Sequence, residues 1–397
     1  MEKLINKSIY CDYNSTSPLS KSVTQFLGGG DFLFANPSSV HQLGKKSKKS
    51  IRETQDYILD LYGLEQKIWR LIFHSGATEG LNSIYMGFAY KYLVEGSSSM
   101  SLYFSPLDHS CVLNLLPLIK KLGVKAVSLP TLDDGSINEE EAIKLINEDS
   151  SHVKILNYTW INNETGLVQS LEIASKIKDQ TGVTVIVDAV QSPGKISDWK
   201  KLYSSLDAYV FSAHKFGALK GTGFSLVKND LSFSPLLFGG GQNDSLRSGT
   251  ENITGIQSIK LAYQDLEKIT SRLDFDKQKR DFLKDIEEHI FSIIDNEKMM
   301  VSRNLNNRSN NTICFISPSV KSNVIMMSFD LNGLQVSSGS ACSSGASLPS
   351  RILLELGYSN DESLGGIRMS FGPELSKGDV DLIKKRLTDS LGKYYYK

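Results

Sequence analysis

One lysine, Lys215, lies in a small, polar, glycine-containing turn at residues 212–217 (SAHKFG). The residues before it, 206–211 (LDAYVF), favour a β-strand, so the pattern can display an amine at a strand end, where an α/β sheet places its chemistry. An amine in a fixed, partly desolvated position can lose its proton and form a Schiff base with an aldehyde. Most lysines are surface charges, and this segment by itself leaves that alternative open.

Two other polar side chains follow apolar segments that are typical of strands. Asp188 comes directly after residues 183–187 (VTVIV), the clearest buried parallel strand in the chain. Such an aspartate can cap the next element, or its charge can keep a heteroaromatic nitrogen protonated. His109 follows a candidate strand at 102–104 and could stack on a flat cofactor or move protons, although loop histidines more often do neither.

A phosphate site is one interpretation of residues 75–80 (SGATEG), which lie between a predicted strand at 69–73 and the start of a helix. Free backbone N–H groups and the positive end of the helix dipole would face a phosphate there. The alternative is an ordinary helix start capped by Thr78 or Ser75. The loop is neither a Walker A nor a GxGxxG motif, so both interpretations stay open.

The C-terminal part of the chain contributes one cysteine and one arginine. Cys342 lies in residues 337–345 (SSGSACSSG), which are too small and polar to pack as core. Cys314, inside the apolar segment 312–316, fits an inert buried thiol much better. Arg368 lies in a predicted strand at 367–371 and could bind a carboxylate with two hydrogen bonds.

The elements that position these groups alternate between strands and helices from about residue 68 to 225, which predicts a doubly wound, mostly parallel sheet. One edge of that sheet would collect residues 75–78, His109, Asn163, Asp188 and Lys215. A helix follows from about 255 to 298, and the pattern then changes to α+β. We expect a large domain at 15–255 and a smaller α+β domain made of 1–14 and 256–397.

The composition excludes several functions. The chain has 397 residues, of which 40% are hydrophobic and 22% charged, as in a soluble globular protein. Its 44 basic and 44 acidic residues cancel, so no global charge favours nucleic acid or an anionic membrane. The basic cluster at 45–52 has helical spacing and predicts a solvated helix face.

The N-terminal residues lack the apolar core of a secretory signal, and no apolar run is long enough to span a bilayer. The four cysteines are widely spaced and form no CxxC pair: Cys11, Cys111, Cys314 and Cys342. This spacing argues against a disulfide framework and against a structural zinc site. We therefore expect a reducing, cytoplasmic location and no metal.

Taken together, these segments resemble the fold-type I pyridoxal phosphate enzymes of the class V aminotransferase superfamily, specifically the group I (NifS/IscS-type) cysteine desulfurases. The resemblance runs from Tyr10 to Gly372 in the family's order and spacing. Its most specific motifs are SAHKFG at 212–217, VDAVQ at 187–191, RSGT at 247–250 and SSGSAC at 337–342.

The resemblance implies a role for each motif. Lys215 would bind pyridoxal 5'-phosphate covalently and move the substrate Cα proton, Asp188 would pair with the pyridine nitrogen, and His109 would stack on the ring. Gln191 and Asn163 would contact the cofactor's phenolic oxygen and nearby substrate groups. The resemblance also implies that the substrate carboxylate is bound by Arg368, with Asn14. It implies that the phosphate is bound by Ser75, Gly76, Ala77, Thr78, Ser212 and His214, together with Thr250 from the second subunit of a homodimer.

The implied reaction removes sulfur from L-cysteine, because Cys342 matches the family's catalytic cysteine. Its thiolate would attack the substrate sulfur, which leaves alanine and a persulfide on Cys342. The persulfide would pass to an acceptor protein in iron–sulfur cluster assembly or a thiolation pathway. The distance in sequence from Cys342 to Arg368 resembles the long loop of group I enzymes.

Several positions differ from the usual family pattern: His74 replaces a threonine, Asp108 replaces a glutamate, Gly80 and Leu81 lie within a variant of the Thr-Glu-Ala-Asn-Asn motif, and Pro373-Glu374 follows the Arg368 strand. None of them removes a proposed catalytic group.

The alternatives are an aminotransferase, a selenocysteine lyase or a silent binding subunit. Cys342 argues against the first, and the retention of Lys215, Asp188 and His109 against the last.

Overall fold

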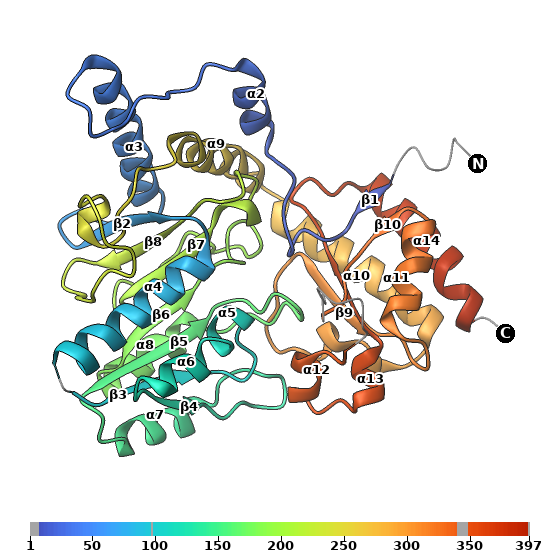
Figure 1. Cartoon of the computed structure of the whole chain (residues 1–397). Helices are drawn as coiled ribbons and strands as arrows, with labels where there is room; N and C mark the ends of the chain where they lie inside the picture. Colours follow the sequence, from blue (N-terminus) through green and yellow to red (C-terminus); the bar gives the residue numbers. More distant parts are fainter. Residues whose placement is uncertain (1–7, 97, 340–347, 396–397) are drawn as a thin grey trace.

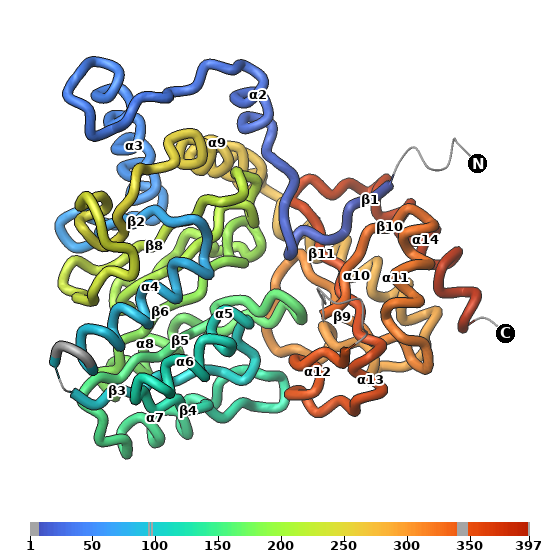
Figure 2. The backbone as a smooth tube through the Cα atoms, viewed as in Figure 1, coloured from blue at the N-terminus to red at the C-terminus, as the bar shows by residue number. Residues whose placement is uncertain are grey.

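The structure is a computed structural model that describes residues 8–96, 98–339 and 348–395. Figure 1 shows a large lobe built on a seven-stranded sheet and a small lobe that contains β1 and the C-terminal elements. The segment between β1 and the first helix of the large lobe passes between the two lobes (Figure 2). No helix in the described part of the chain is long and apolar enough to cross a membrane.

The central sheet has the strand order β2-β8-β7-β6-β5-β3-β4. Its strands are β2 (Trp69–His74), β3 (Met100–Phe104), β4 (Lys125–Ser128), β5 (Val153–Thr159), β6 (Thr184–Asp188), β7 (Ala208–Ser212) and β8 (Gly223–Lys228). The pairs from β4 to β7 are parallel, and β8 runs antiparallel to both β7 and β2. The parallel part brings the ends of β5, β6 and β7 to one edge, with Thr159 paired to Asp188 and Asp188 to Val210.

Helices cover both faces of this sheet. They are α2 (Lys21–Gly29), α3 (Gln42–Leu61), α4 (Ala77–Ala89) with the π-helical η1 (Tyr90–Glu95), α5 (Ser110–Leu113), α6 (Leu116–Lys121), α7 (Glu139–Glu148), α8 (Leu171–Thr181) and α9 (Ile253–Thr270). Successive side chains of β6 pack on opposite faces of the sheet, since Val185 and Val187 lie in one core and Ile186 lies in the other. This alternation is what a sheet buried on both sides requires.

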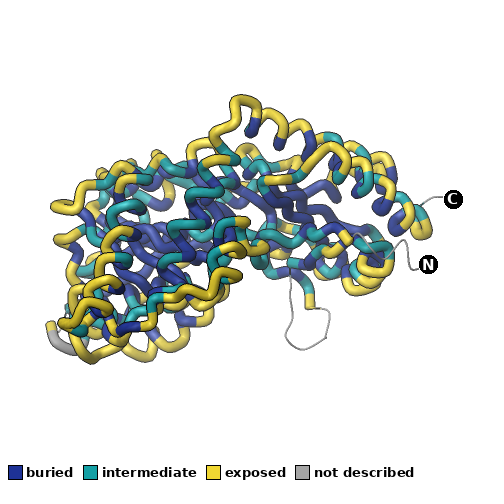
Figure 3. Tube along the Cα trace, turned by 90° about the horizontal axis from the view of Figure 1, so that it is seen from above, coloured by how far each residue is buried: buried dark blue, intermediate teal, exposed yellow. Residues whose placement is uncertain are grey.

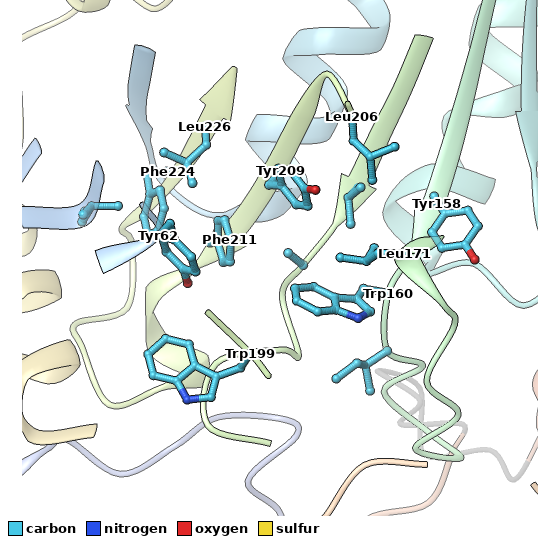
Figure 4. Packing of buried hydrophobic residues seen from close by; sticks show 14 of the residues in the cluster. Tyr62, Tyr158, Trp160, Leu171, Trp199, Leu206, Tyr209, Phe211, Phe224 and Leu226 are labelled. Atoms are coloured by element: carbon cyan, nitrogen blue, oxygen red, sulfur yellow. The ribbon is translucent and has the colours of Figure 1, made fainter. Parts of the chain in front are cut away.

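The core on the face of α3, α7, α8 and α9 is rich in aromatic side chains, several of which appear in Figure 4. Phe211 and Phe224 stack with ring centroids 4.7 Å apart, and Tyr62 lies 5.3 Å from Phe211. Trp199 stacks on Tyr263 of α9 at 5.7 Å. These contacts fix β7 and α9 next to the turn that carries Lys215.

The small lobe has its own core and two short sheets. Its elements are β1 (Ile9–Tyr10) with β10 (Leu334–Gln335), β9 (Thr312–Ile316) with β11 (Gly366–Ser370), α10 (Phe275–Ile294), α11 (Ser322–Leu331), α12 (Arg351–Glu355), α13 (Asn360–Leu364) and α14 (Lys377–Tyr395). Ile286, Phe315 and Leu387 are wholly buried in this core, and Cys314 is buried beside them, as expected. Figure 3 shows buried segments inside each lobe, enclosed by more exposed ones.

The single helix predicted from 255 to 298 is wrong, because α9 ends at Thr270 and α10 begins at Phe275. The two helices pack in different cores, so the chain must turn between them, and Leu273 in the turn is fully exposed. The basic residues at 45–52 lie on the exposed side of α3, while Ile51 and Ile58 are buried, so the predicted solvated face is confirmed. The domain boundaries stay a prediction.

Candidate active site

A cavity of about 420 Å³ lies at the carboxyl edge of the parallel strands, between β5, β6, β7 and the start of α4. Eleven of the predicted site residues line it: Ser75, Gly76, Ala77, Thr78, His109, Asn163, Asp188, Gln191, Ser212, His214 and Lys215. They come from five separate segments that the sheet topology brings to one place. The predicted collection of polar groups at one sheet edge is therefore confirmed.

Lys215 ends a short 3-10 turn, η2 (Ala213–Lys215), directly after β7. Gly217 permits this turn with φ at +96°, a conformation that favours glycine. The Lys215 amine donates hydrogen bonds to the main-chain oxygens of Asn14, at 2.8 Å, and Ser15, at 2.7 Å. Burial, with Arg368 nearby, lowers the pKa of Lys215 to about 8, so an uncharged, nucleophilic amine is accessible near neutral pH.

Asp188 ends β6 and is buried. Its Oδ1 accepts a hydrogen bond from the Val190 main-chain N–H at 3.1 Å. Burial raises the pKa of Asp188, whereas His109 and Lys215 lower it. A buried carboxylate with few donors is a strong partner for a cation or a protonated ring nitrogen.

His109 precedes α5, and its Nδ1 accepts a hydrogen bond from the Cys111 main-chain N–H at 3.1 Å. That bond places the ring proton of the neutral form on Nε2. Desolvation, together with Lys215 and Arg351, lowers the pKa of His109 although Asp188 opposes the shift. The uncharged imidazole is therefore favoured, which suits stacking on a flat ring.

The start of α4 faces the cavity with Gly76 as its N-cap, and no side chain caps the helix. The first-turn N–H groups are thus available to an anion, as the phosphate interpretation requires. Glu79 does not compete for them, because its carboxylate accepts from the Ser75 N–H at 2.8 Å and pairs with Arg247 at 2.7 Å. These bonds lower the pKa of Glu79 to about 2 against the effect of burial, so it stays ionised.

Arg368 and Asn14 do not line this cavity. The Arg368 Nη2 donates to Asp12 Oδ1 and Ser15 Oγ, both at 2.6 Å, and Nη1 donates to the Asn163 main-chain oxygen at 3.1 Å. The Asn14 side chain is occupied by protein partners, because Nδ2 donates to the Asn163 main-chain oxygen and to Thr312 while Oδ1 accepts from two donors. Their predicted contact with a substrate carboxylate stays a prediction.

Thr250 is exposed and lines a different hollow, beside Arg247 and Asn252. Its predicted role across a subunit boundary stays a prediction. Cys342 lies outside the described residues. The described residues before it are tied to the site, because Ser337 exchanges two main-chain hydrogen bonds with Arg368, at 3.1 and 2.7 Å. On the other side of the gap, Ser350 donates to Glu164 at 2.8 Å.

Sequence reasoning missed several residues of the site. Asp12 lies in a polar segment that matches no motif, yet it pairs with Arg368 at 2.6 Å. Cys111 lines the cavity, but burial raises its thiol pKa, so the thiolate is disfavoured. Lys195 is buried and donates to the side chains of Asn14 and Gln191. A lysine in a glycine- and proline-containing turn carries no periodic signal, so only the fold could reveal its burial.

The comparisons with known proteins agree with this geometry. The aminotransferase class V family matches residues 9–383, nearly the whole chain. The chain belongs to the class V aminotransferase family. The predicted resemblance to its NifS/IscS-type members is confirmed, as is the α/β fold with a mostly parallel sheet.

Known proteins match nearly the whole length of the chain. The cysteine desulfurase IscS of Dictyoglomus turgidum is 31% identical over 386 residues, which cover 95% of this chain and 93% of the relative. A solved NifS-like protein is 24% identical, with a TM-score of 0.86 over 98% of this chain and 100% of its own, and has the same fold. The structure of SspA in complex with cysteine is 25% identical, with a TM-score of 0.76 over 92% of this chain and 99% of its own.

Proposed function

We propose that this chain is a pyridoxal phosphate-dependent cysteine desulfurase that converts L-cysteine to L-alanine and retains the sulfur as a persulfide on Cys342. The single observation that carries the proposal is the Lys215 amine, with its lowered pKa, facing one cavity together with the buried Asp188. The full-length similarity to cysteine desulfurases supports the choice of reaction within the family.

The cavity residues fit pyridoxal phosphate on three independent features. Lys215 supplies an amine for the aldehyde, Asp188 supplies a buried carboxylate for the ring nitrogen, and the uncapped start of α4 supplies N–H donors for the phosphate. Ser212 and His214 line the same cavity. When bound, the cofactor supplies an electron sink that stabilises negative charge at the substrate Cα.

Three residues of the cavity would each have a separate role in the reaction. Lys215, with a pKa lowered to about 8, would accept the Cα proton and return it, because a group with a pKa near neutral pH can do both. Asp188 would hold a protonated ring nitrogen in place through its negative charge. His109, whose pKa is lowered, would stack on the ring without adding a second positive charge.

Cys342 would provide the sulfur chemistry. Its thiolate attacks the substrate sulfur, the S–S bond forms as the Cβ–S bond breaks, and the electron pair left on carbon takes up a proton. Cysteine and the Cys342 thiol thus become alanine and the Cys342 persulfide, with no external oxidant or reductant. The anchoring of Ser337 on Arg368 supports a loop that starts beside the substrate carboxylate site.

The proposal includes a homodimer and a sulfur-acceptor protein. Thr250 would reach the phosphate of the partner's cofactor, which agrees with its exposed position outside the cavity of its own chain. The acceptor would take the persulfide sulfur for iron–sulfur clusters or for thiolation. Size-exclusion chromatography with light scattering tests the dimer directly.

The test of function is to incubate the purified protein with L-cysteine and a thiol reductant, and to assay sulfide, alanine and 2-oxo acids. Equal amounts of sulfide and alanine are expected. A 2-oxo acid formed with an amino acceptor would instead indicate an aminotransferase, and no turnover with bound cofactor would indicate a silent subunit.

A further inference from the structure

A second cavity, of about 310 Å³, lies between the two lobes, and the proposed reaction does not use it. Its walls come from α9 of the large lobe, from Lys279 of α10 and residues 371–374 of the small lobe, and from residues 17–21. Lys215 lines both cavities, so the two spaces adjoin at that residue. We call this space the interlobe cavity.

Two lysines of the interlobe cavity are buried. Lys195 is 6% exposed and Lys279 is 3% exposed. The Lys195 amine donates to Asn14 Oδ1, at 3.1 Å, and to Gln191 Oε1, and the Lys279 amine donates to the Gly372 main-chain oxygen. Within the described residues, neither amine forms an ion pair with a carboxylate.

A buried ammonium without a counter-charge is unfavourable, so both amines lose proton affinity. Burial lowers the pKa of Lys279 to about 7, although Glu374 and Asp379 oppose the shift. Burial also lowers the pKa of Lys195 strongly, with Lys215 and Arg368 adding to the effect. Nothing in the proposed reaction accounts for two such amines in one cavity.

The rim of the interlobe cavity is also basic. Lys21, Lys268 and Arg272 line it and are exposed. Apart from Lys195, Lys215 and Lys279, whose pKa values are lowered, three lining residues are basic and two are acidic, in a chain whose net charge is zero. One of the acids, Asp265, already accepts hydrogen bonds from the Ser22 N–H and hydroxyl at 2.6 and 2.7 Å. The local potential therefore attracts an anion.

One wall of the interlobe cavity is apolar, which limits the kind of anion it suits. Ala262, Leu266 and Ile269 of α9 line it, together with Phe371. Inorganic ions gain nothing from such a wall, whereas an apolar body attached to an anionic group does.

We propose that the interlobe cavity binds a small organic anion, with its carboxylate or phosphate group on the amines of Lys195 and Lys279 and its apolar body against α9. Binding there reaches the active site through Asn14, which accepts from Lys195 through its side chain and from Lys215 through its main-chain oxygen. The site is independent of which family reaction the chain performs.

The test is calorimetric titration of the holoprotein at pH 8 with benzoate and phenyl phosphate, in two buffers of different ionisation enthalpy. Bound cofactor keeps added phosphate groups out of the α4 site. We expect one anion per chain, and uptake of protons, because the Lys279 amine, whose pKa is about 7, is mostly neutral at pH 8 and becomes charged beside the anion. Benzyl alcohol, which lacks the charge, and inorganic phosphate, which lacks the apolar body, should each bind at least about tenfold more weakly.

Variants locate the site. Lys279→Met should weaken benzoate at least about tenfold and reduce proton uptake, whereas Lys277→Met, an exposed lysine of the same helix that does not line the cavity, should change neither. Ile269→Trp keeps both buried amines but fills the space, and should abolish binding. The proposal is overturned if neither anion binds, or if benzoate binds equally well to the Lys279 and Ile269 variants, which would place it on Arg368 instead.

Discussion

Replacing Gly80 with alanine should destabilise the protein, because the added methyl group has no room. An alanine Cβ at position 80 would lie 2.6 Å from His74 Nε2 and 2.8 Å from Val210 Cγ1. The His74 ring is buried and bonded to Ser225 Oγ at 2.9 Å, so it cannot simply turn away. Overpacking of this kind costs about 1–3 kcal/mol, and alanine's better helix propensity returns about 1 kcal/mol. We expect a net loss of up to about 2 kcal/mol.

The assay is urea unfolding followed by tryptophan fluorescence for the wild type, Gly80→Ala, His74→Ala and the double variant. His74→Ala alone loses a hydrogen bond and leaves a cavity, so it is destabilising. In that background the two contacts with the His74 ring are gone and only Val210 Cγ1, at 2.8 Å, remains, so the cost of Gly80→Ala should fall by about 1 kcal/mol. That result would show that the unusual residues His74 and Gly80 form one compensating pair.

Gly28→Ala in α2 is the matched control, because no heavy atom lies within 4 Å of the added Cβ and the glycine has no positive φ. It should leave the free energy of unfolding unchanged or slightly higher. The reasoning fails if Gly80→Ala costs the same in both His74 backgrounds, or if Gly28→Ala is equally costly.

Three further predictions concern the active site. Asp188→Asn should lower kcat about ten- to a hundredfold, because that factor corresponds to the loss of one hydrogen bond to a charged group. The absorbance of the bound cofactor should stay near that of the wild type. Arg368→Lys keeps the charge but loses the planar guanidinium group that can donate two hydrogen bonds to a carboxylate. The KM for L-cysteine should therefore rise about tenfold, with a smaller change in kcat. An unchanged KM would rule out carboxylate binding by Arg368. The pKa of Lys215, lowered to about 8 from 10.5, predicts that the rate of cofactor uptake by the apoprotein rises with pH and levels off above about pH 9. A rate still rising at pH 10 would contradict the lowered pKa.

The same shift sets the pH dependence of stability for the apoprotein. A lysine whose pKa is lower in the folded state binds fewer protons in the folded state than in the unfolded chain. Burying this lysine therefore lowers the free energy of unfolding least when the amine is neutral in both states. Stability contributed by Lys215 therefore rises between about pH 8 and pH 10.5.

The parallel strands of the large lobe were predictable because they are continuous apolar runs with polar residues at their ends. The 183–187 segment is buried on both faces, and Asp188 follows it directly. Once such strands are parallel, their ends must meet at one edge, which is why eleven predicted residues line one cavity.

Contacts between distant segments were not predictable. Asp12 pairs with Arg368 across 356 positions, and Lys195 becomes buried against Asn14, 181 positions away. No local pattern encodes either contact. The break between α9 and α10 was missed for a related reason, since helical spacing continues on both sides and only the separate cores require the turn.

The most direct test of the central claim is a comparison of Cys342→Ser with Cys111→Ser in the presence of L-cysteine and a reductant. Both variants lose one thiol, but Cys111 has a raised pKa and no role in the proposed reaction, although it lines the cavity. Cys342→Ser should bind pyridoxal phosphate normally and lose at least about 99% of sulfide release, equivalent to 2.7 kcal/mol or more, whereas Cys111→Ser should stay near the wild type. Sulfide released by Cys342→Ser as fast as by the wild type would contradict the persulfide mechanism.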